Sequence, residues 1–401
     1  MRVLFTTPIL EHPAAGGPQL RIENTIKALS KVTELSVIYQ ANHPCLEVDK
    51  TNEFFARFAN KYYAVYKYPR NKLLRFILRG LRRLFSLEYD SQAETIIDFV
   101  KVNNIDVIWF GYGNISFPLI SLIKKAVPDV KVVCDTDSVW SRFVLRELPF
   151  SSGRRKEKIK KIGALKQAEE RAWVKLCEVT TAVSEVDAEY YRSIAVEPNR
   201  VHLFSNVIDL EDYSLVPEVP KEFKKPSMFL AGSYGPNSAM NMAANWILDE
   251  VLPIVRETCP DVHFYIVGRR SDSEFGHCAS ESVTITGMLE TVLPYLHHSS
   301  VALVPLKFES GTRFKILEAG ACKTPLVSTT LGAEGIPVTH NQDLLIADEA
   351  IDFARAIIQI LNDEKFGNRL AGNCYRLVEE NYSIAVLEQE AQKILEYLKN
   401  V

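Results

Sequence analysis

Short apolar runs rich in β-branched residues alternate with longer stretches of helical period along the first half of the chain. Residues 22–31 and 169–177 have that helical period, and the apolar runs between such stretches predict strands. The predicted strands are Val3–Thr6, Leu35–Tyr39, Val107–Phe110, Lys131–Cys134 and Val179–Ala182. Continuous apolar strands separated by helices are typical of a parallel sheet covered on both faces, so the first half predicts a Rossmann-like α/β domain.

The second half repeats this scheme after an interruption at 206–227, where three prolines and mixed charges break the pattern. Strands are predicted at 227–233, 263–268, 283–287, 301–306 and 325–329, with helices at 243–258, 292–299 and from about residue 313. We therefore expect two α/β domains, 1–205 and 206–385. Ligands of such sheets bind outside the carboxyl ends of the strands, which suggests a site in a cleft between the domains.

The composition is consistent with two domains and argues against several classes of protein. The chain has 401 residues, of which 47% are apolar, and its net charge of -3 gives no global reason to expect nucleic acid. The seven cysteines are scattered singly, which argues against a zinc site or a disulfide framework and for a reducing compartment. No signal-peptide pattern or long apolar span is present, so we expect a cytoplasmic protein.

The most informative stretch is Phe308–Ile336, where a polar turn precedes a helix and an apolar strand. The turn Ser310-Gly311-Thr312 lies at a predicted helix start, where unpaired N–H groups and the helix dipole attract anions. Arg313 and Lys315 add formal charge that suits a phosphate. Glu318 lies five residues after Arg313, which is roughly 7 Å along the helix axis, and its carboxylate suits a ribose diol. The alternative is a solvated face with weak local ion pairs.

Near the start of the chain, Gly16 and Gly17 lie between a strand and a helix, where glycine lets the backbone approach a ligand. A plain flexible turn would explain them as well. The motif is not G-x-G-x-x-G, and the second strand ends without an acidic residue for a dinucleotide ribose, which disfavours an oxidoreductase. His12 lies in the same loop and is a minor candidate for a functional role.

A local basic patch lies at 66–86, with seven Lys or Arg residues between Lys67 and Ser86, no acid, and apolar residues at helical spacing. A basic amphipathic helix of this kind predicts contact with a membrane surface, at the inner face of the membrane if the protein is cytoplasmic. A helix that packs on the core with a solvated basic face explains it equally. A second basic run, 153–161, contains a glutamate and predicts a loop or a helix start.

Four motifs together resemble a known family: "SNVIDLEDY", "AVSEVDAEYY", "FLAGSYGPNSAMNMAANWILDEVLPIV" and "SGTRFKILEAGACKTPLVSTTLGAEGI". They are similar to the retaining, nucleotide-sugar-dependent glycosyltransferases of the GT-B architecture, a group that includes sucrose synthase and many bacterial polysaccharide and lipopolysaccharide transferases. The resemblance implies a UDP- or GDP-linked donor held by the second domain, a glycan or lipid-linked acceptor held by the first, and no metal. It also implies that a last helix, 386–401, crosses back to the first domain.

The family carries two glutamates eight residues apart in the polar turn and its helix. Glu318 matches the second, which resembles the ribose-binding one, but Ser310 stands at the position of the first and Glu309 is one residue out of register. Gly311, Thr312, Arg313 and Lys315 match a subgroup that has Gly-Thr-Arg-x-Lys in this turn. The stretch from Ser310 to Ile336 is the most specific part of the resemblance.

The resemblance departs from the family at a second place. Gly232, Ser233 and Asn237 match the donor loop after the first strand of the second domain, but the Arg and Lys that many relatives carry there are absent. We therefore expect Arg313 and Lys315 to take the phosphate role.

In the first domain, "VVCDTDSVW" lies where relatives often have a histidine near the bond being made, and here Asp135 and Asp137 stand instead. Either carboxylate could orient the acceptor hydroxyl or the donor sugar. Asp137, Arg313 and Lys315 are the preferred catalytic candidates. The alternative for the carboxylates is that they cap a helix. The sequence thus predicts a retaining glycosyltransferase of polysaccharide biosynthesis. A nucleotide-sugar epimerase of related fold and a catalytically silent nucleotide-binding scaffold remain alternatives.

Overall fold

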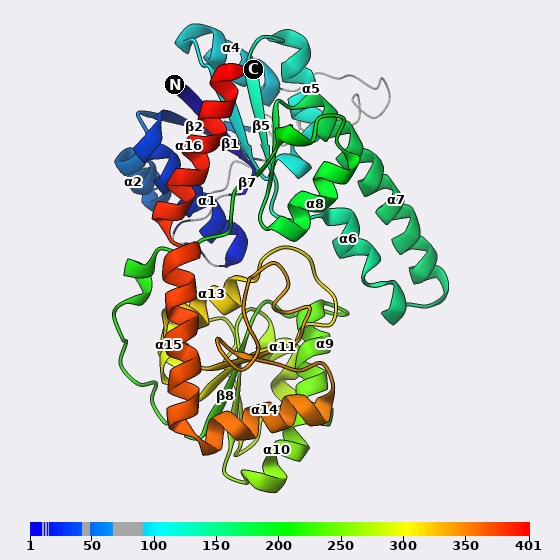
Figure 1. Cartoon of the computed structure of the whole chain (residues 1–401), viewed down its shortest axis with the longest axis vertical. Coiled ribbons are helices and arrows are strands. Elements are labelled where there is room, and N and C mark those ends of the chain that lie inside the picture. Colours follow the sequence, from blue (N-terminus) through cyan, green and yellow to red (C-terminus); the bar gives the residue numbers. More distant parts are fainter. Residues whose placement is uncertain (10–11, 13, 15, 42–48, 67–90) are drawn as a thin grey trace, which may run out of the picture. The chain divides into compact units, whose positions relative to one another are not determined.

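The computed structural model describes residues 1–9, 12, 14, 16–41, 49–66 and 91–401, and the chain divides into two compact units. The first unit comprises 1–141, 160–205 and 387–401, and the second comprises 142–159 and 206–386. Most of the last helix, α16 (Ile384–Asn400), therefore belongs to the first unit, and its red ribbon lies beside the blue elements in Figure 1. Residues 142–159 were predicted to be part of the first domain, whereas they belong to the second unit.

The first unit is built on a seven-stranded parallel sheet with the order β3-β2-β1-β4-β5-β6-β7. Its strands are β1 (Arg2–Thr7), β2 (Glu34–Ala41), β3 (Lys61–Tyr66), β4 (Val107–Gly111), β5 (Lys131–Asp135), β6 (Val179–Ala182) and β7 (Val201–Leu203). In β1 every residue from Val3 to Thr7 is buried, as expected of a strand covered on both faces.

Helices cover this sheet with apolar stripes. Along α1 the buried residues Ile22, Ile26 and Leu29 recur at three- and four-residue spacing, so one face of the helix packs on the sheet. The helices of the first unit that precede α16 are α1 (Gly17–Val32), α2 (Asp49–Phe58), α4 (Ser91–Asn103), α5 (Phe117–Ala126), α6 (Trp140–Leu145), α7 (Gly153–Leu176) and α8 (Glu185–Ile194), with α6 and α7 continuing into the second unit. The basic run 153–161 is therefore the start of a helix.

The second unit has a six-stranded parallel sheet with the order β10-β9-β8-β11-β12-β13. Its strands are β8 (Ser227–Ala231), β9 (His263–Val267), β10 (Val283–Ile285), β11 (Val301–Val304), β12 (Leu326–Ser328) and β13 (Leu345–Ile346). In both sheets the first strand lies in the interior, and the order in which strands are added reverses at that strand, as in the Rossmann fold. The predicted α/β organisation with two Rossmann-like halves is confirmed.

The helices of the second unit are α9 (Ala239–Trp246), α10 (Leu252–Thr258), α11 (Ser271–Phe275), α12 (Leu293–His298), α13 (Phe314–Ala321), α14 (Ala350–Asn362) and α15 (Glu364–Asn381). A π-helical turn at Ile247–Val251 joins α9 to α10, just before Pro253, whose ring nitrogen cannot donate to the helical ladder. Helix α13 packs closely on α15, since a Cβ at Gly320 would lie 2.8 Å from Cγ2 of Val378. Within the described residues, no helix is long and apolar enough to cross a membrane.

Candidate functional site

The second unit brings the predicted donor residues to one edge of one sheet. Strands β8 and β11 are neighbours at the point where the strand order reverses, and ligands of such sheets bind outside the carboxyl ends of strands at this point. The loop after β8 carries Gly232, Ser233 and Asn237. The loop after β11 carries the turn 310–312 and leads into α13. The two groups of residues therefore follow neighbouring strands at the same edge of the sheet, and their role in a donor site stays a prediction.

Buried residues and a hydrogen bond fix the loop after β11. Leu306 and Phe308 are buried, and the Leu306 carbonyl accepts a hydrogen bond from Oγ1 of Thr329 at 2.6 Å. Gly311 has φ of 82°, in the left-handed region that glycine adopts without steric cost. The turn that precedes α13 consequently has a defined shape before any ligand arrives.

Arg313 is turned toward its own loop. The residue is only 6% exposed, and its Nη1 donates to the Ser310 carbonyl at 2.5 Å and to the Gly311 carbonyl. A guanidinium that donates to two carbonyls of the preceding turn fixes the conformation of that turn. Nη1 of Arg313 therefore lies against its own turn, and the expected contact of Arg313 with a phosphate stays a prediction.

Glu318 and Lys315 lie three residues apart on α13, a spacing that puts them on one face, and both are half-buried. Oη of Tyr213 donates to Oε1 of Glu318 at 3.2 Å. Burial raises the pKa of Glu318, while the Lys315 charge and the Tyr213 hydrogen bond oppose that rise. Burial likewise lowers the pKa of Lys315, and the charge of Glu318 opposes that change. The helix therefore presents a cation and an anion that each favour the charged form of the other.

Tyr213 was not predicted as a site residue. It ends a 3-10 turn, Leu210–Tyr213, which begins with the Asp209 side chain accepting from the Glu211 N–H at 3.3 Å. Tyr213 is buried and lies in the motif "SNVIDLEDY" that carries part of the family resemblance. That motif was the available signal, but it does not indicate which residue of α13 the tyrosine contacts.

A second missed contact comes from the segment 142–159. Arg146 forms a two-pronged ion pair with Glu334, with Nη1–Oε2 at 2.6 Å and Nη2–Oε1 at 2.7 Å, and its Nη1 also donates to the Glu309 carbonyl at 2.7 Å. Burial raises the pKa of Glu334, but the hydrogen bond and charge of Arg146 outweigh it and leave the pKa below its usual value. Phe150 packs on Phe308 with ring centroids 5.7 Å apart. The segment therefore braces the loop after β11 from outside.

The loop after β8 is tightly packed against its neighbours. A Cβ at Gly232 would lie 2.7 Å from Cε of Met240, so a larger residue there would have to displace the Met240 side chain. Asn237 is exposed and has φ of 58°, a conformation that asparagine tolerates better than most residues, and Ser233 is also exposed. These three residues lie at the carboxyl end of β8, in the position expected for contact with a donor.

In the first unit, Asp135 and Asp137 have different environments. Asp135 is fully buried, forms an ion pair with Nη2 of Arg21 and accepts from Oγ1 of Thr181 at 2.7 Å. Arg21 also donates from Nη2 to the Phe204 carbonyl at 3.1 Å. Asp135 therefore joins α1 to the end of β5 in the interior, where an acceptor sugar does not reach it.

Asp137 is half-buried, and its Oδ1 accepts from Nδ2 of Asn114 at 2.8 Å and from Nε1 of Trp140 at 2.9 Å. Burial raises its pKa, and these two hydrogen bonds oppose the rise. In α6 the Ser141 N–H donates to Glu170 instead, at 2.8 Å, which disfavours the helix-cap alternative for Asp137. Of the two carboxylates, Asp137 is the more exposed, and Asn114 and Trp140 hold it in place.

The loop after β1 reaches the same edge of the first sheet. Gly17 begins α1, and Gly16 precedes it with φ of 166°, which is extended backbone that any residue adopts. His12 stacks on Phe54 with ring centroids 4.7 Å apart, and its Nδ1 lies 2.7 Å from Oε1 of Glu23. The backbone at Gly16 therefore does not require glycine, and His12 has structural partners.

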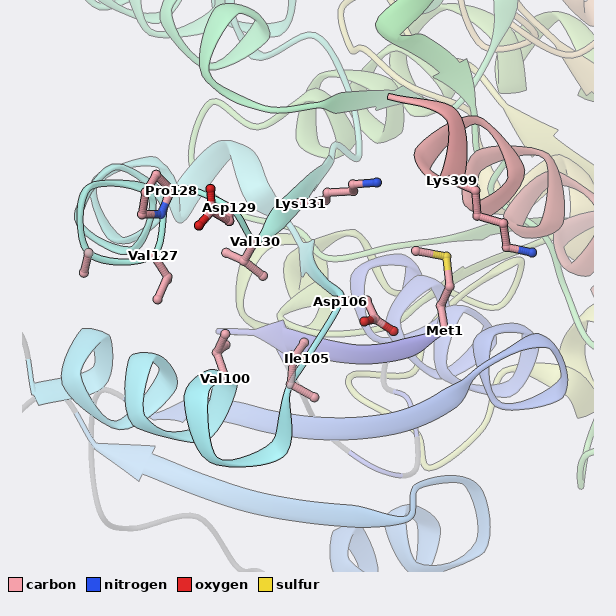
Figure 2. Close-up of a pocket in the computed structure, with 11 residues that line it drawn as sticks. Met1, Val100, Ile105, Asp106, Val127, Pro128, Asp129, Val130, Lys131 and Lys399 are labelled. Atoms are coloured by element: carbon pink, nitrogen blue, oxygen red, sulfur yellow. The ribbon is translucent and has the colours of Figure 1, made fainter.

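A pocket of about 660 Å³ lies at the opposite edge of the first sheet (Figure 2). Its wall includes Met1, Asp106 and Lys131, which lie at the amino ends of β1, β4 and β5. Ligands of Rossmann-like sheets bind at the carboxyl ends, and none of the predicted site residues lines this pocket. Among the described residues, no group of three or more His, Cys, Asp or Glu is arranged to hold a metal ion.

Comparison with known proteins agrees with this reading of the second unit. Residues 226–363 match the family model described as "Glycosyl transferases group 1". A curated relative, an uncharacterized 44.6 kDa protein in the cps region of Klebsiella pneumoniae, is 25% identical over 165 residues, or 39% of this chain. The match spans 42% of that relative, less than half of its length.

Solved structures resemble the whole chain. Sucrose-phosphate synthase from Thermosynechococcus elongatus has a TM-score of 0.72 at 14% identity and covers 100% of both chains. HepE of Anabaena in complex with UDP and glucose has a TM-score of 0.65 at 13% identity and covers 99% of both chains. TarM has a TM-score of 0.66 at 12% identity and covers 99% of this chain and 98% of its own. The protein therefore has the GT-B fold, and residues 226–363 match the model of the group 1 glycosyl transferases.

Proposed function

We propose that the protein is a retaining glycosyltransferase that moves a sugar from a nucleoside-diphosphate sugar to a glycan or lipid-linked acceptor without requiring a metal. The observation that carries this proposal is the arrangement on α13, where Glu318 and Lys315 share a face beside Tyr213 inside the group 1 domain. A carboxylate and an ammonium at this spacing match the ribose and the diphosphate of such a donor.

Glu318 accepts hydrogen bonds from the ribose hydroxyls in this proposal. The Tyr213 bond to Oε1 orients the carboxylate and, with the Lys315 charge, favours its ionised form against burial. Lys315 faces the diphosphate and stabilises the negative charge that develops there. Arg313 acts mainly by holding the turn 310–312, with its charge close to the same phosphates. The backbone of that turn and of Gly232, Ser233 and Asn237 completes the donor site.

The proposed reaction replaces one glycosidic bond by another on the same face of the sugar. The bond between the anomeric carbon and the diphosphate oxygen breaks as the acceptor oxygen bonds to the anomeric carbon. The acceptor proton passes to the departing diphosphate, so no protein nucleophile is needed. Asp137 is proposed to orient the acceptor hydroxyl or the donor sugar, since Asn114 and Trp140 hold its carboxylate in place.

The first donor class to test is UDP-linked. HepE of Anabaena was solved with UDP and with UDP-glucose, and a TarM variant from S. aureus with UDP. GDP-linked donors are the next class. A membrane contact for a lipid-linked acceptor was predicted at 66–86, of which residues 67–86 lie outside the described part of the chain, so it remains a prediction. The reducing, cytoplasmic setting and the role in polysaccharide biosynthesis are likewise proposed.

One experiment separates this proposal from its alternatives. The purified protein is incubated with UDP-sugars and candidate glycan or lipid-linked acceptors without metal, and both free UDP and the sugar products are analysed. Transfer with retained configuration that is lost in Glu318→Ala but kept in Glu380→Ala, an exposed glutamate of α15, supports the proposal. A sugar altered while still attached to its nucleotide would show an epimerase. Binding without turnover would favour the silent scaffold, for which Ser310 at the position of the family's first glutamate is the argument.

A further inference from the structure

The loop after β8 lacks the cations that a diphosphate needs. Residues 231–241 contain no Lys or Arg, although the loop lies at the switch point of the sheet. Arg313, the nearest arginine in the loop after β11, donates to carbonyls of its own turn. A diphosphate placed at this edge therefore requires positive charge from another element.

Two arginines, Arg269 and Arg270, follow the neighbouring strand β9, and their backbone lies against this loop. The Gly232 N–H donates to the Val267 carbonyl at 3.0 Å, and the Tyr234 N–H donates to the Arg269 carbonyl at 2.9 Å. A Cβ at Gly268 would lie 2.1 Å from the Gly232 oxygen, and Gly268 has φ of 119°, so only glycine permits this approach. The loop after β8 and the arginines after β9 are thus one packed unit.

The two arginines have different surroundings. Nη2 of Arg270 donates to Oε1 of Glu274 at 2.9 Å, and Oε2 of Glu274 accepts from Nδ2 of Asn241 at 2.9 Å. Oδ1 of Asn241 in turn accepts from the Gly235 N–H at 2.8 Å. The charge of Arg270 is therefore compensated by Glu274, and this chain of hydrogen bonds holds the loop after β8 in place.

Arg269 is exposed, and its side chain makes no hydrogen bond or ion pair with the residues that the structure describes. Strands of one sheet are about 4.8 Å apart, so β9 lies roughly 10 Å from β11, two strands away. An extended arginine side chain and a diphosphate together bridge a distance of that order. We propose that Arg269 binds the diphosphate of the donor, in place of the cations missing from the loop after β8.

This inference rests on the proposed function, because it requires a nucleoside diphosphate at the carboxyl edge of the second sheet. It assigns Arg269 as a binding residue and Arg270 as a positioning residue. It also divides the positive charge that faces the phosphates between Arg269 on one side and Lys315 on the other, whereas the sequence predicted that Arg313 and Lys315 would supply it.

The test is isothermal titration of the full chain with UDP, GDP, ADP and TDP, and with the monophosphate of whichever nucleotide binds best. Arg269→Ala and Arg269→Lys are compared with wild type and with Arg355→Ala, an exposed arginine of α14 that serves as the matched control. A lost charge-assisted hydrogen bond predicts at least tenfold weaker diphosphate binding in Arg269→Ala, since such bonds contribute about 1.5–3 kcal/mol. We expect partial recovery in Arg269→Lys, a smaller loss for the monophosphate, and no change in Arg355→Ala.

Two results would count against the inference in distinguishable ways. If wild type binds a diphosphate and Arg269→Ala binds it equally well, the inference is wrong while the proposed function stands. If wild type binds none of the four diphosphates, both are wrong. Because Arg269 is exposed, its replacement is expected to leave the thermal unfolding midpoint unchanged, and Arg269→Lys keeps the test valid if Arg269→Ala does not fold.

Discussion

The contact between Tyr213 and Glu318 gives the sharpest prediction about the donor site. Tyr213→Phe removes the hydroxyl that donates to Oε1 of Glu318 and keeps the ring. Burial raises the pKa of Glu318, and the Tyr213 bond is one of two interactions that oppose the rise, so the variant has a still higher Glu318 pKa. Ribose binding by the ionised carboxylate should therefore weaken most at low pH and recover as the pH rises.

The distance sets the size of this effect. Hydrogen bonds to charged groups contribute about 1.5–3 kcal/mol. The Oη–Oε1 distance of 3.2 Å is long for a hydroxyl that donates to a carboxylate, so the lower limit applies. About 1.5 kcal/mol corresponds to roughly tenfold weaker donor binding.

The assay is titration of UDP by calorimetry between roughly pH 5 and pH 8, for wild type and Tyr213→Phe. The matched control is Tyr375→Phe on α15, whose exposed hydroxyl lies 3.2 Å from Oε1 of Glu379, a contact of the same length and type. We expect the Tyr213→Phe curve to be displaced to higher pH and the control to follow wild type. Superimposable curves for Tyr213→Phe and wild type would refute the role given to Glu318.

Four further substitutions test turnover and stability. Asp137→Asn should lower turnover at least about tenfold and leave donor affinity unchanged, which steady-state kinetics would measure. Asp135→Asn should instead destabilise the fold by about 3–5 kcal/mol, because it breaks a buried ion pair, and urea unfolding would measure that loss. Because Glu334 has a lowered pKa when folded, its pair with Arg146 stabilises above the unfolded-state pKa and is lost as the pH falls through the folded one. Arg146→Ala should remove this acid-dependent part, up to about 1 kcal/mol for a partly exposed pair, and an unchanged stability profile against pH would contradict the assignment. Gly268→Ala should cost at least about 1–3 kcal/mol, measured by urea unfolding, because its positive φ and close carbonyl exclude a side chain.

The fold was predictable because its signal is local. The strand β1 is buried from Val3 to Thr7, and these residues are apolar or β-branched, which favours a strand; β4 and β9 are likewise buried throughout and mostly apolar. Alternation of such runs with helical periods leaves few arrangements other than parallel sheets. The glycines were less informative about the site. Gly16, which was predicted as a site residue, has an extended conformation that any residue can adopt, whereas Gly268, which was not predicted, is required by packing.

The site was predictable in part. The position of Glu318 on a helix follows from spacing, but its partner Tyr213 lies 105 residues earlier and is known only from the tertiary structure. Arg146 and Glu334 are 188 residues apart for the same reason. Spacing also does not decide the direction of a long side chain, so it did not indicate that Nη1 of Arg313 donates to carbonyls of its own turn.

The two carboxylates after β5 show the same limit at short range. Asp135 and Asp137 are two residues apart and chemically identical, and only the packing of α1 and the loop after β4 distinguishes them. The pairing of Asp135 with a buried arginine leaves Asp137 as the candidate for chemistry.

The most direct test of the donor site is a thermal-shift screen of wild type and Glu318→Ala against UDP, GDP, ADP and TDP without metal. A bound ligand raises the unfolding midpoint in proportion to the logarithm of its saturation. We predict that one diphosphate, with UDP the first candidate, raises the midpoint of wild type and that Glu318→Ala abolishes the shift. An equal shift in Glu318→Ala would contradict a donor site on α13, and no shift with any of the four would contradict a donor site in this protein altogether.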